Sequence, residues 1–433
     1  MSPELIGIIG FIVLLLFLAG GMPIGFALGI VGFGGLVILI SLEAALIKIG
    51  VIGFQIVSHY ELGVLPLFLL MAHICFATGA SRNFFDAAAK FFGHRRGGLA
   101  MASIGGCAGF GAISGSSLAT AATMGLVAIP EMRKHNYEPT LAAGCVAAGG
   151  TLGSLIPPSG MLIVFGILTE QSIGKLFAAG IIPGLLQAVF YLIAIVILCG
   201  FKPSLGPAVA PSSWGERFQS LKLTLDVTLL VLLVIGGLLI GWFTPTESAA
   251  VGAAGAIVLG LVRKKLNRSI FTKALRDTLQ TTGMLYAIII GAFVFSTFIA
   301  ASGVADSLSR WILEGDPSPL IIIFGVLVVY FILGMFLDAM AMMALTIPVF
   351  FPIIQEAGIN GIWFGILLVR AMEIALITPP VGMNVFVIQG IAKDISLGSI
   401  FRGVTPFLVA DLFHLALLIA LPILALFLPG LMS

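Results

Sequence analysis

Apolar segments of about 20 residues recur along nearly the whole sequence, and no other feature limits its possible folds as strongly. A helix of that length crosses the ~30 Å hydrocarbon layer of a bilayer. Hydrophobic residues make up 60% of the 433 and charged residues only 9%, whereas soluble domains have roughly 25% charged residues. The polar stretches between the apolar segments are too short for an extramembrane domain. The sequence therefore predicts an all-α integral membrane protein with many spans.

The two halves of the sequence resemble each other after a shift of 222 residues. The shift superimposes prolines in three places: Pro23 on Pro245, Pro130 on Pro352, and Pro157-Pro158 on Pro379-Pro380. Self-similarity of this kind indicates a duplicated architecture. We therefore predict two repeats, residues 1–201 and 223–433, joined by a linker rich in Pro and Ser at 202–222.

Lys and Arg occupy different loops in the two halves. Cytoplasmic loops of membrane proteins carry an excess of both residues. Residues 41–58 contain only Lys48, whereas the equivalent stretch 263–276 contains six basic residues. Equivalent loops therefore lie on opposite sides of the membrane, which predicts an inverted-topology repeat with both termini outside and the linker in the cytoplasm. This topology places all but four of the 21 Lys and Arg on the cytoplasmic side.

Within each repeat we expect two spans, an amphipathic arm, a third span, a hairpin, a helix broken at the double proline and a last span. In the first repeat the arm covers 44–58, the hairpin 97–131 and the broken helix 139–170. In the second repeat the arm covers 269–278, the hairpin about 319–355 and the broken helix 361–392.

Residues 105–117 contain too many glycines for a plain helix interior. We expect a re-entrant hairpin with its tip near Ser114 to Ser117. Irregular backbone at membrane depth is tolerated only where it is buried in protein or lines a cavity. Helix N-termini and hydroxyls at such a tip bind carboxylates, and free carbonyls bind cations. Small residues that only allow close helix packing are the alternative interpretation.

Each double proline removes two amide donors and must interrupt its helix. A kink alone would explain one such break, but two breaks at equivalent positions of two inverted repeats favour a binding site. Ser159 follows the first break, and Thr378 and Asn384 flank the second.

A few charged residues fall inside apolar segments. Asp338 is a candidate functional residue because a carboxylate at membrane depth is costly; a helix cap is the alternative. Arg370 and Glu373 are three residues apart, which predicts a structural ion pair. Asp411 and His414 could pair in the same way.

The sequence contains no motif for catalysis, since HExxH, GxSxG and GxxxxGK[ST] are all missing. We therefore expect no catalytic residues and no nucleic-acid partner, and an intramembrane enzyme is the least favoured alternative.

Three long motifs resemble the large membrane subunit of tripartite ATP-independent periplasmic (TRAP) transporters. They are the runs Gly111 to Thr120, Gly149 to Ser159 and Glu373 to Phe386, and the resemblance extends essentially end to end. It implies sodium-coupled uptake of an organic acid, such as a C4-dicarboxylate or a sialic or sugar acid, across a bacterial inner membrane. It also implies periplasmic termini and an elevator mechanism, in which a transport domain that holds both hairpins slides against a scaffold.

The resemblance further implies two protein partners in addition to the lipid bilayer. One is a periplasmic substrate-binding protein, and the other is a small membrane subunit of about four helices. We expect that subunit to be a separate chain, because the sequence starts directly in its first span and ends at Ser433. Sodium ions are the only expected coupling ions, and no other cofactor is implied. The alternative is a single-chain sodium/dicarboxylate symporter that needs no binding protein.

The resemblance also assigns site residues by motif. The substrate-binding set is Ser114, Ser116, Ser159, Asp338 and Asn384. The sodium-binding set is Ser114, Gly115, Ser117, Pro157, Asp338, Thr378 and Pro379.

Overall fold

The protein is a multi-pass membrane protein. The computed structural model describes residues 2–432, which form 21 α-helices and two short 3-10 helices. Seven of these helices are long and apolar enough to cross a membrane. The bent pair Pro139–Leu155 and Gly160–Thr169 forms an eighth span if it is counted as one.

The first half contributes eleven α-helices and η1 (Tyr60–Gly63). They are α1 (Pro3–Ala19), α2 (Ile24–Leu39), α3 (Leu42–Ser58), α4 (Val64–Ala77), α5 (Ala80–Phe92), α6 (Gly98–Ser114), α7 (Ser117–Lys134), α8 (Pro139–Gly150), α9 (Leu152–Leu155), α10 (Gly160–Thr169) and α11 (Ile173–Phe201).

The second half follows η2 (Pro203–Leu205) and contributes ten α-helices. They are α12 (Trp214–Leu239), α13 (Pro245–Val262), α14 (Arg268–Ser302), α15 (Val304–Leu313), α16 (Pro319–Gly334), α17 (Ala339–Glu356), α18 (Gly361–Ala375), α19 (Met383–Ile391), α20 (Leu397–Ala420) and α21 (Ile423–Leu431).

The helices of the two halves correspond after the 222-residue shift. Helices α7 and α17 begin and end at equivalent positions, and α8 and α18 begin at equivalent positions. The arms differ. Helix α3 is separated from α4 by His59 and η1, whereas residues 269–278 are the first part of the uninterrupted 35-residue helix α14. The segment expected as a second arm is therefore not a separate helix.

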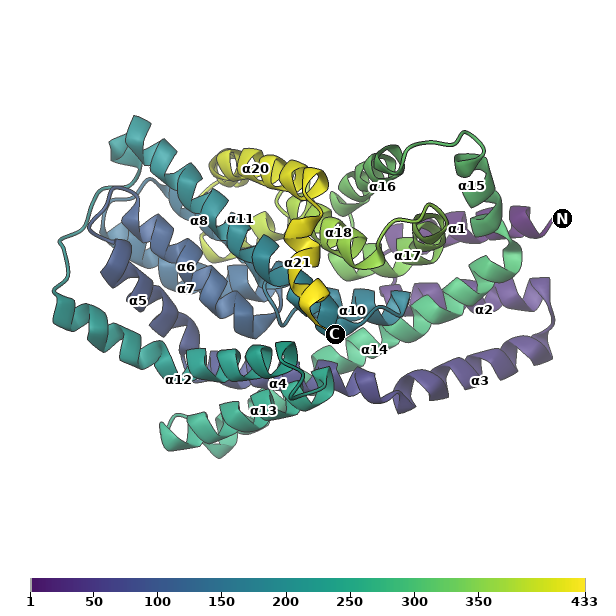
Figure 1. Cartoon of the computed structure of the whole chain (residues 1–433), viewed down its shortest axis with the longest axis horizontal. Coiled ribbons are helices and arrows are strands. Elements are labelled where there is room, and N and C mark those ends of the chain that lie inside the picture. The colour runs from purple at the N-terminus through teal and green to yellow at the C-terminus, as the bar shows by residue number, and fades with distance from the viewer. Residues whose placement is uncertain (1, 433) are drawn as a thin grey trace.

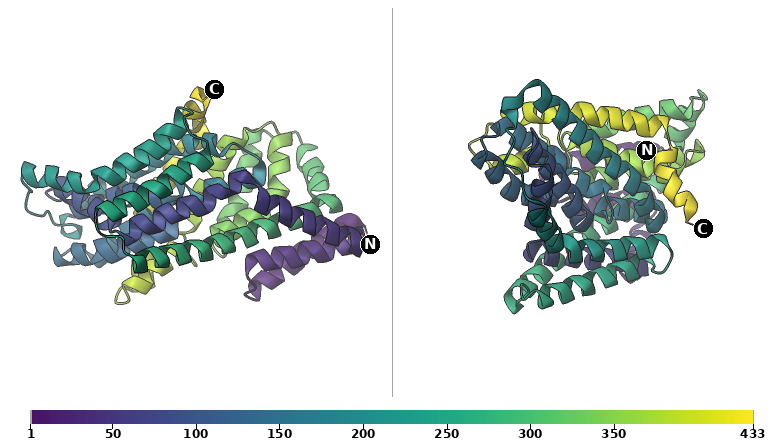
Figure 2. Two further views of the ribbon diagram at one scale, coloured as in Figure 1. Left: turned by 90° about the horizontal axis from the view of Figure 1, so that it is seen from below. Right: turned by 60° about the vertical axis from the view of Figure 1, so that its left-hand side comes forward.

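An outer group of helices forms one side of the molecule. Helix α2 packs along α14. The equivalent of α2 in the second half, α13, packs along α4, and α4 also packs on α14. Gly25 permits the close approach of α2, because a Cβ there would lie 2.6 Å from the backbone of Ala287. In Figure 1, α4, α12 and α13 lie along the lower edge and α3 at the lower right, and Figure 2 shows these helices in front when the molecule is seen from below.

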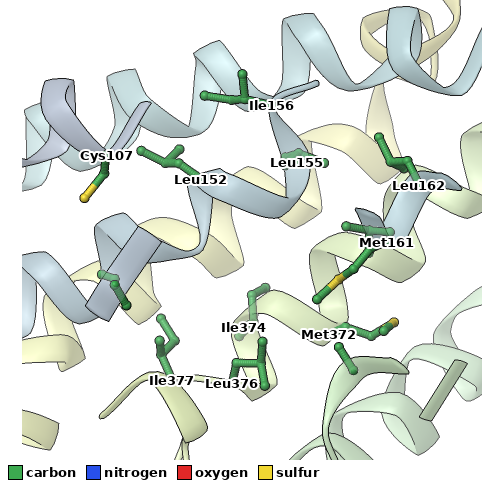
Figure 3. Close-up of a cluster of buried hydrophobic side chains, with 14 of the residues drawn as sticks. Cys107, Leu152, Leu155, Ile156, Met161, Leu162, Met372, Ile374, Leu376 and Ile377 are labelled. Atoms are coloured by element: carbon green, nitrogen blue, oxygen red, sulfur yellow. The ribbon is translucent and has the colours of Figure 1, made fainter. Parts of the chain in front are cut away.

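The inner group contains the two hairpins and the two broken helices, and here the halves interlock. Helix α10 of the first half packs on α17 of the second, and α19 of the second half packs on α7 of the first. The two breaks share one hydrophobic cluster. Figure 3 shows Leu152 and Leu155 on one side of it and Ile374, Leu376 and Ile377 on the other. The tips and breaks are therefore held together by a continuous core.

Candidate functional site

A cavity of about 750 Å³ lies between the outer helices and the two hairpin tips. Helices α2, α4 and α14 supply the outer wall, including Pro23, Phe26, Leu65, Phe68, Thr281 and Ile288. The inner wall includes Ser114, Gly115, Ser116, Pro158, Gly160, Asp338, Met340 and Met383. The cavity thus contacts both tips and residues beside both breaks.

Four helices begin at this cavity. Helices α7 and α17 start directly after the two tips, and α10 and α19 start directly after the two breaks. Unpaired amides and the helix dipole make an N-terminus favourable for negative charge. Among the described residues that line the cavity none is Lys or Arg, and Asp338 is the only charged one. Attraction of an anion would therefore depend on backbone amides and hydroxyls.

The first tip is bonded to the first break. The amide of Gly160 donates to the carbonyl of Gly115 at 3.0 Å, and the hydroxyls of Ser114 and Thr120 are 2.7 Å apart. Gly115 has φ +59°, and a Cβ there would lie 2.5 Å from the carbonyl oxygen of Pro158. The position therefore requires glycine, both for its backbone conformation and for its contact with the break.

The second tip presents Asp338 to the cavity. One carboxylate oxygen, Oδ1, accepts hydrogen bonds from the amides of Met340 (2.9 Å) and Ala341 (3.2 Å) and so caps α17. The side chain is half-buried and lines the cavity. Both interpretations of Asp338, as a helix cap and as a cavity residue, therefore apply together.

Three of the predicted residues lie behind the first tip instead of in the cavity wall. Ser159 is fully buried, donates to the carbonyl of Ser154 and caps α10 through the amide of Leu162. The side-chain amide of Asn384 donates to the hydroxyl of Ser117 at 2.9 Å and is itself fully buried. Substrate binding by Ser159 and Asn384 stays a prediction that the cavity lining does not support.

The predicted sodium residues of the second break also lie outside the cavity lining. Thr378 donates to the carbonyl of Ile374 at 2.7 Å, and Pro379 is exposed. Pro157 does not line the cavity either, although Pro158 does. The structure thus groups Ser114, Gly115, Ser116 and Asp338 at one cavity and leaves the others outside its lining.

The outer wall of the cavity has no signal in the sequence. Thr281, Phe68 and Leu65 lie in ordinary apolar helices, and no motif marks them. Pro23 stands out in the sequence only as a marker of the repeat. A residue that faces a cavity across a helix interface has no local signature, so only the tertiary packing identifies it.

Two predicted charge pairs are wrong. Arg370 forms its ion pair with Asp411 of α20, which also accepts a hydrogen bond from Tyr191 at 2.9 Å, and all three side chains are fully buried. Spacing along one helix makes a pair possible, but the packing of α18 on α20 places Asp411 closer. Glu373 therefore has no ion-pair partner among residues 2–432. His414 packs on Phe190, with ring centroids 5.6 Å apart.

Comparisons with known proteins give one consistent result. Residues 11–424 match the family described as the DctM component of the tripartite ATP-independent periplasmic transporter. The chain is 37% identical over 398 residues to the C4-dicarboxylate TRAP transporter large permease protein DctM of Pseudomonas aeruginosa, with 92% of each chain covered. It is 32% identical over 415 residues to the sialic acid TRAP transporter large permease protein SiaM of Vibrio cholerae, with 96% of each covered. Its fold is similar to the crystal structure of the YdaH transporter of Alcanivorax borkumensis, with a TM-score of 0.57, 16% identity, and 85% and 87% of the two chains covered.

Proposed function

We propose, from the premise that this chain belongs to the DctM component family of the tripartite ATP-independent periplasmic (TRAP) transporters, that it carries a small organic acid anion into a bacterial cell together with sodium. As a member of that family the chain is a large permease, a transporter and not an enzyme. Relatives named for C4-dicarboxylates and for sialic acid support a carboxylate-bearing substrate.

The observation that carries the proposal is the convergence of four helix N-termini on a cavity whose described lining has no basic side chain. A substrate carboxylate would accept hydrogen bonds from an amide in the first turn of α7, near Leu118, and from the hydroxyls of Ser114 and Ser116. The apolar outer wall, with Phe68 and Leu65, would contact the carbon skeleton.

The charge of the same cavity supports sodium coupling. Asp338 and a substrate carboxylate about 6 Å apart repel each other by about 3 kcal/mol at an effective dielectric constant of about 20. A cation bound at Asp338 removes this repulsion and makes substrate and ion bind together. Carbonyls at Gly115, Pro157, Thr378 and Pro379 are further candidate ligands at the tips and breaks. Each sodium ion that moves fully across the membrane supplies about 2.3 kcal/mol per 100 mV.

The position of the cavity supports an elevator mechanism. It lies between the outer helices and the inner group that carries both tips and both breaks, so movement of the inner group along the outer one would carry a bound substrate. We propose that the outer group is the scaffold and the inner group the transport domain, with re-entrant hairpins α6–α7 and α16–α17.

Contacts between loops support the inverted topology. Arg133, after the first hairpin, pairs with Asp394, after the second broken helix. A Cβ on Gly361, after the second hairpin, would lie 3.1 Å from the side chain of Gln171, after the first broken helix. The bent helix pair α8–α10 separates these two contacts, so equivalent loops of the two halves lie at opposite ends. The basic loops would then face the cytoplasm and both termini the periplasm.

We propose two protein partners, a small membrane subunit of about four helices and a periplasmic substrate-binding protein. Exposed apolar side chains on α3, including Leu46, Val51 and Phe54, fit either the bilayer or a neighbouring membrane helix.

The test is uptake of C4-dicarboxylates and sialic acid into proteoliposomes that hold this chain with its small subunit. The sodium gradient and the binding protein are each supplied or left out. Uptake that requires both supports the proposal. Uptake that requires sodium alone would instead identify a single-chain symporter, and uptake indifferent to sodium would refute the coupling. Tags in the loops at Arg268 and Glu314 should report cytoplasm and periplasm, and a shared side would refute the inverted topology.

A further inference from the structure

A second polar site lies behind the first tip, outside the cavity, and its centre is Glu373 of α18. This side chain is fully buried, and neither carboxylate oxygen has a hydrogen-bond partner among residues 2–432. The guanidinium on the same helix, Arg370, is paired with Asp411. An ionised carboxylate without a counter-charge is strongly unfavourable in a protein interior. The position therefore calls for a cation that the described residues do not supply.

The groups around Glu373 present oxygen atoms. The hydroxyls of Ser154 and Ser117 lie beside the carboxylate but outside hydrogen-bond geometry. The hydroxyl of Ser154 already accepts the amide of Ser117 at 3.0 Å, and that of Ser117 accepts the side-chain amide of Asn384 at 2.9 Å. The carbonyl oxygen of that same Asn384 amide is buried and has no partner among the residues described. The carboxylate and the two hydroxyls thus lie together, and the side chain of Asn384, with its unpartnered amide oxygen, is joined to them through Ser117.

We infer that Glu373, Ser117, Ser154 and Asn384 form a buried sodium site behind the first tip. The inference rests on the proposed sodium coupling and adds to it a site centred on a carboxylate that lies outside the cavity. Carboxylate, amide and hydroxyl oxygens are ligands for hard cations. A single monovalent ion neutralises Glu373, whereas a divalent ion would leave one buried positive charge.

The site has no counterpart in the other half. After the 222-residue shift the positions of Ser117, Ser154 and Asn384 are occupied by Ala339, Leu376 and Leu162, and that of Glu373 by Thr151. Tips and breaks occur in both halves, so an ion site built from features common to both halves would occur twice. The site at Glu373 depends on side chains found in one copy only, so it occurs once.

The position of the cluster connects an ion to the cavity. Ser117 is the first residue of α7 and follows Ser116, which lines the cavity, while Ser154 precedes the first break and Glu373 and Asn384 flank the second. An ion held there would join the first tip to both breaks. It would stabilise the arrangement that binds substrate without touching the substrate.

The test compares the purified complex of this chain and its small subunit in sodium chloride and in potassium chloride of equal strength, without substrate. We expect sodium to raise the melting temperature of the native protein and Glu373→Gln to reduce that rise. In potassium the variant should melt about 5 °C higher than the native protein, since it lacks the unpaired charge. Calorimetric titration should count one sodium ion fewer per chain. Ser154→Ala keeps the charge and should raise the sodium concentration for half-maximal stabilisation at least about tenfold.

Glu247→Gln is the matched control, because Glu247 is the exposed third residue of α13 and bonds back to its N-cap, Thr244, and this variant should keep the full sodium response. An unchanged ion count and sodium response in Glu373→Gln would overturn the inference while leaving sodium coupling intact. A native protein that does not respond to sodium at all would overturn sodium coupling itself. If Glu373→Gln changes the pH dependence of melting but not the sodium response, the occupant is a proton and the inference is wrong.

Discussion

The two hairpin tips occupy equivalent positions, yet they are held in different ways. Ser116 and Asp338, 222 residues apart, cap α7 and α17 respectively. The first tip is bonded to its break through Gly115 and Ser117. For the second tip, the hydrogen bonds found among residues 2–432 are local ones within the turn and to the start of α17, while Gly334 packs against Ala375 of α18.

This difference indicates a division of roles. A tip that is bonded to the backbone of its break is a fixed wall, whereas a tip held by packing alone opens at a lower free-energy cost. The fixed tip carries hydroxyls and the freer tip carries the charge. We therefore expect the second tip to respond to ions and substrate and the first tip to hold their position.

The largest expected effect comes from Gly115→Ala, which attacks the fixed tip. The left-handed backbone costs an L residue about 1–2 kcal/mol, and the added Cβ would also lie 2.5 Å from the carbonyl oxygen of Pro158. We expect Gly115→Ala to lower the free energy of unfolding by at least ~3 kcal/mol and to abolish uptake. Gly358→Ala is the matched control, because Gly358 has φ +67° and, apart from its chain neighbours, no atom of residues 2–432 lies within 4 Å of its Cβ position. This control should lose only the ~1–2 kcal/mol of the left-handed backbone and should keep its uptake. Equal losses of stability in the two variants would refute the assignment of the first tip as the fixed one.

Asp338→Asn tests the charge of the freer tip. Asn caps a helix as well as Asp does, so the melting temperature in sodium-free buffer should stay close to that of the native protein. Uptake should fall at least about a hundredfold, because the bound cation loses the negative charge of its carboxylate ligand and binds more weakly. Ser116→Ala removes the equivalent cap at a cost of ~1 kcal/mol together with a hydroxyl that we assign to the substrate, so uptake should be lost although the protein still folds. Normal uptake in Asp338→Asn would remove this residue from the site.

Hydrogen exchange should distinguish the tips without any mutation. Amides of residues 339–342 should exchange at least about tenfold faster than those of 117–120, because fewer bonds must open. Sodium and substrate together should slow exchange at the second tip more than at the first. Equal protection of the two segments would show that the hydrogen-bond difference has no dynamic consequence.

The parts of this site that depend on local pattern are predictable from the sequence. Glycines at 105–115 and the two double prolines mark the tips and breaks, and the 222-residue shift by itself relates Ser116 to Asp338. The long apolar segments determine the membrane class. These features are local because glycine, proline and apolar length act on the backbone of the segment that contains them.

Tertiary packing decides the rest. The partner of Arg370 is Asp411, 41 positions away on another helix, and no spacing rule on α18 identifies it. Asn384 and Ser159 stand beside the breaks as expected but turn toward Ser117 and Ser154. Nothing in residues 281–285 interrupts α14, although the equivalent stretch 59–63 separates α3 from α4. In each case the sequence locates a residue along the chain but does not identify the neighbour that it meets.

The smallest expected effect concerns the two contacts that join the halves at opposite ends of the bent helix pair α8–α10. Arg133 and Asp394 form an ion pair at one end, and Gly361 packs near Gln171 at the other. The hydrogen bond from Arg133 lowers the pKa of Asp394, so this pair stabilises the fold above the pKa of the unfolded chain, about 4, and its contribution is lost as the pH falls through the lower folded value. Asp394→Asn should therefore lower the melting temperature slightly at pH 7, and this difference should shrink as the pH falls below about 4 toward the lower folded pKa. Gly361→Ala, at the other end, crowds the neutral side chain of Gln171 and should change melting by the same amount at every pH. A pH-independent effect of Asp394→Asn would mean that Arg133 and Asp394 do not pair in the membrane.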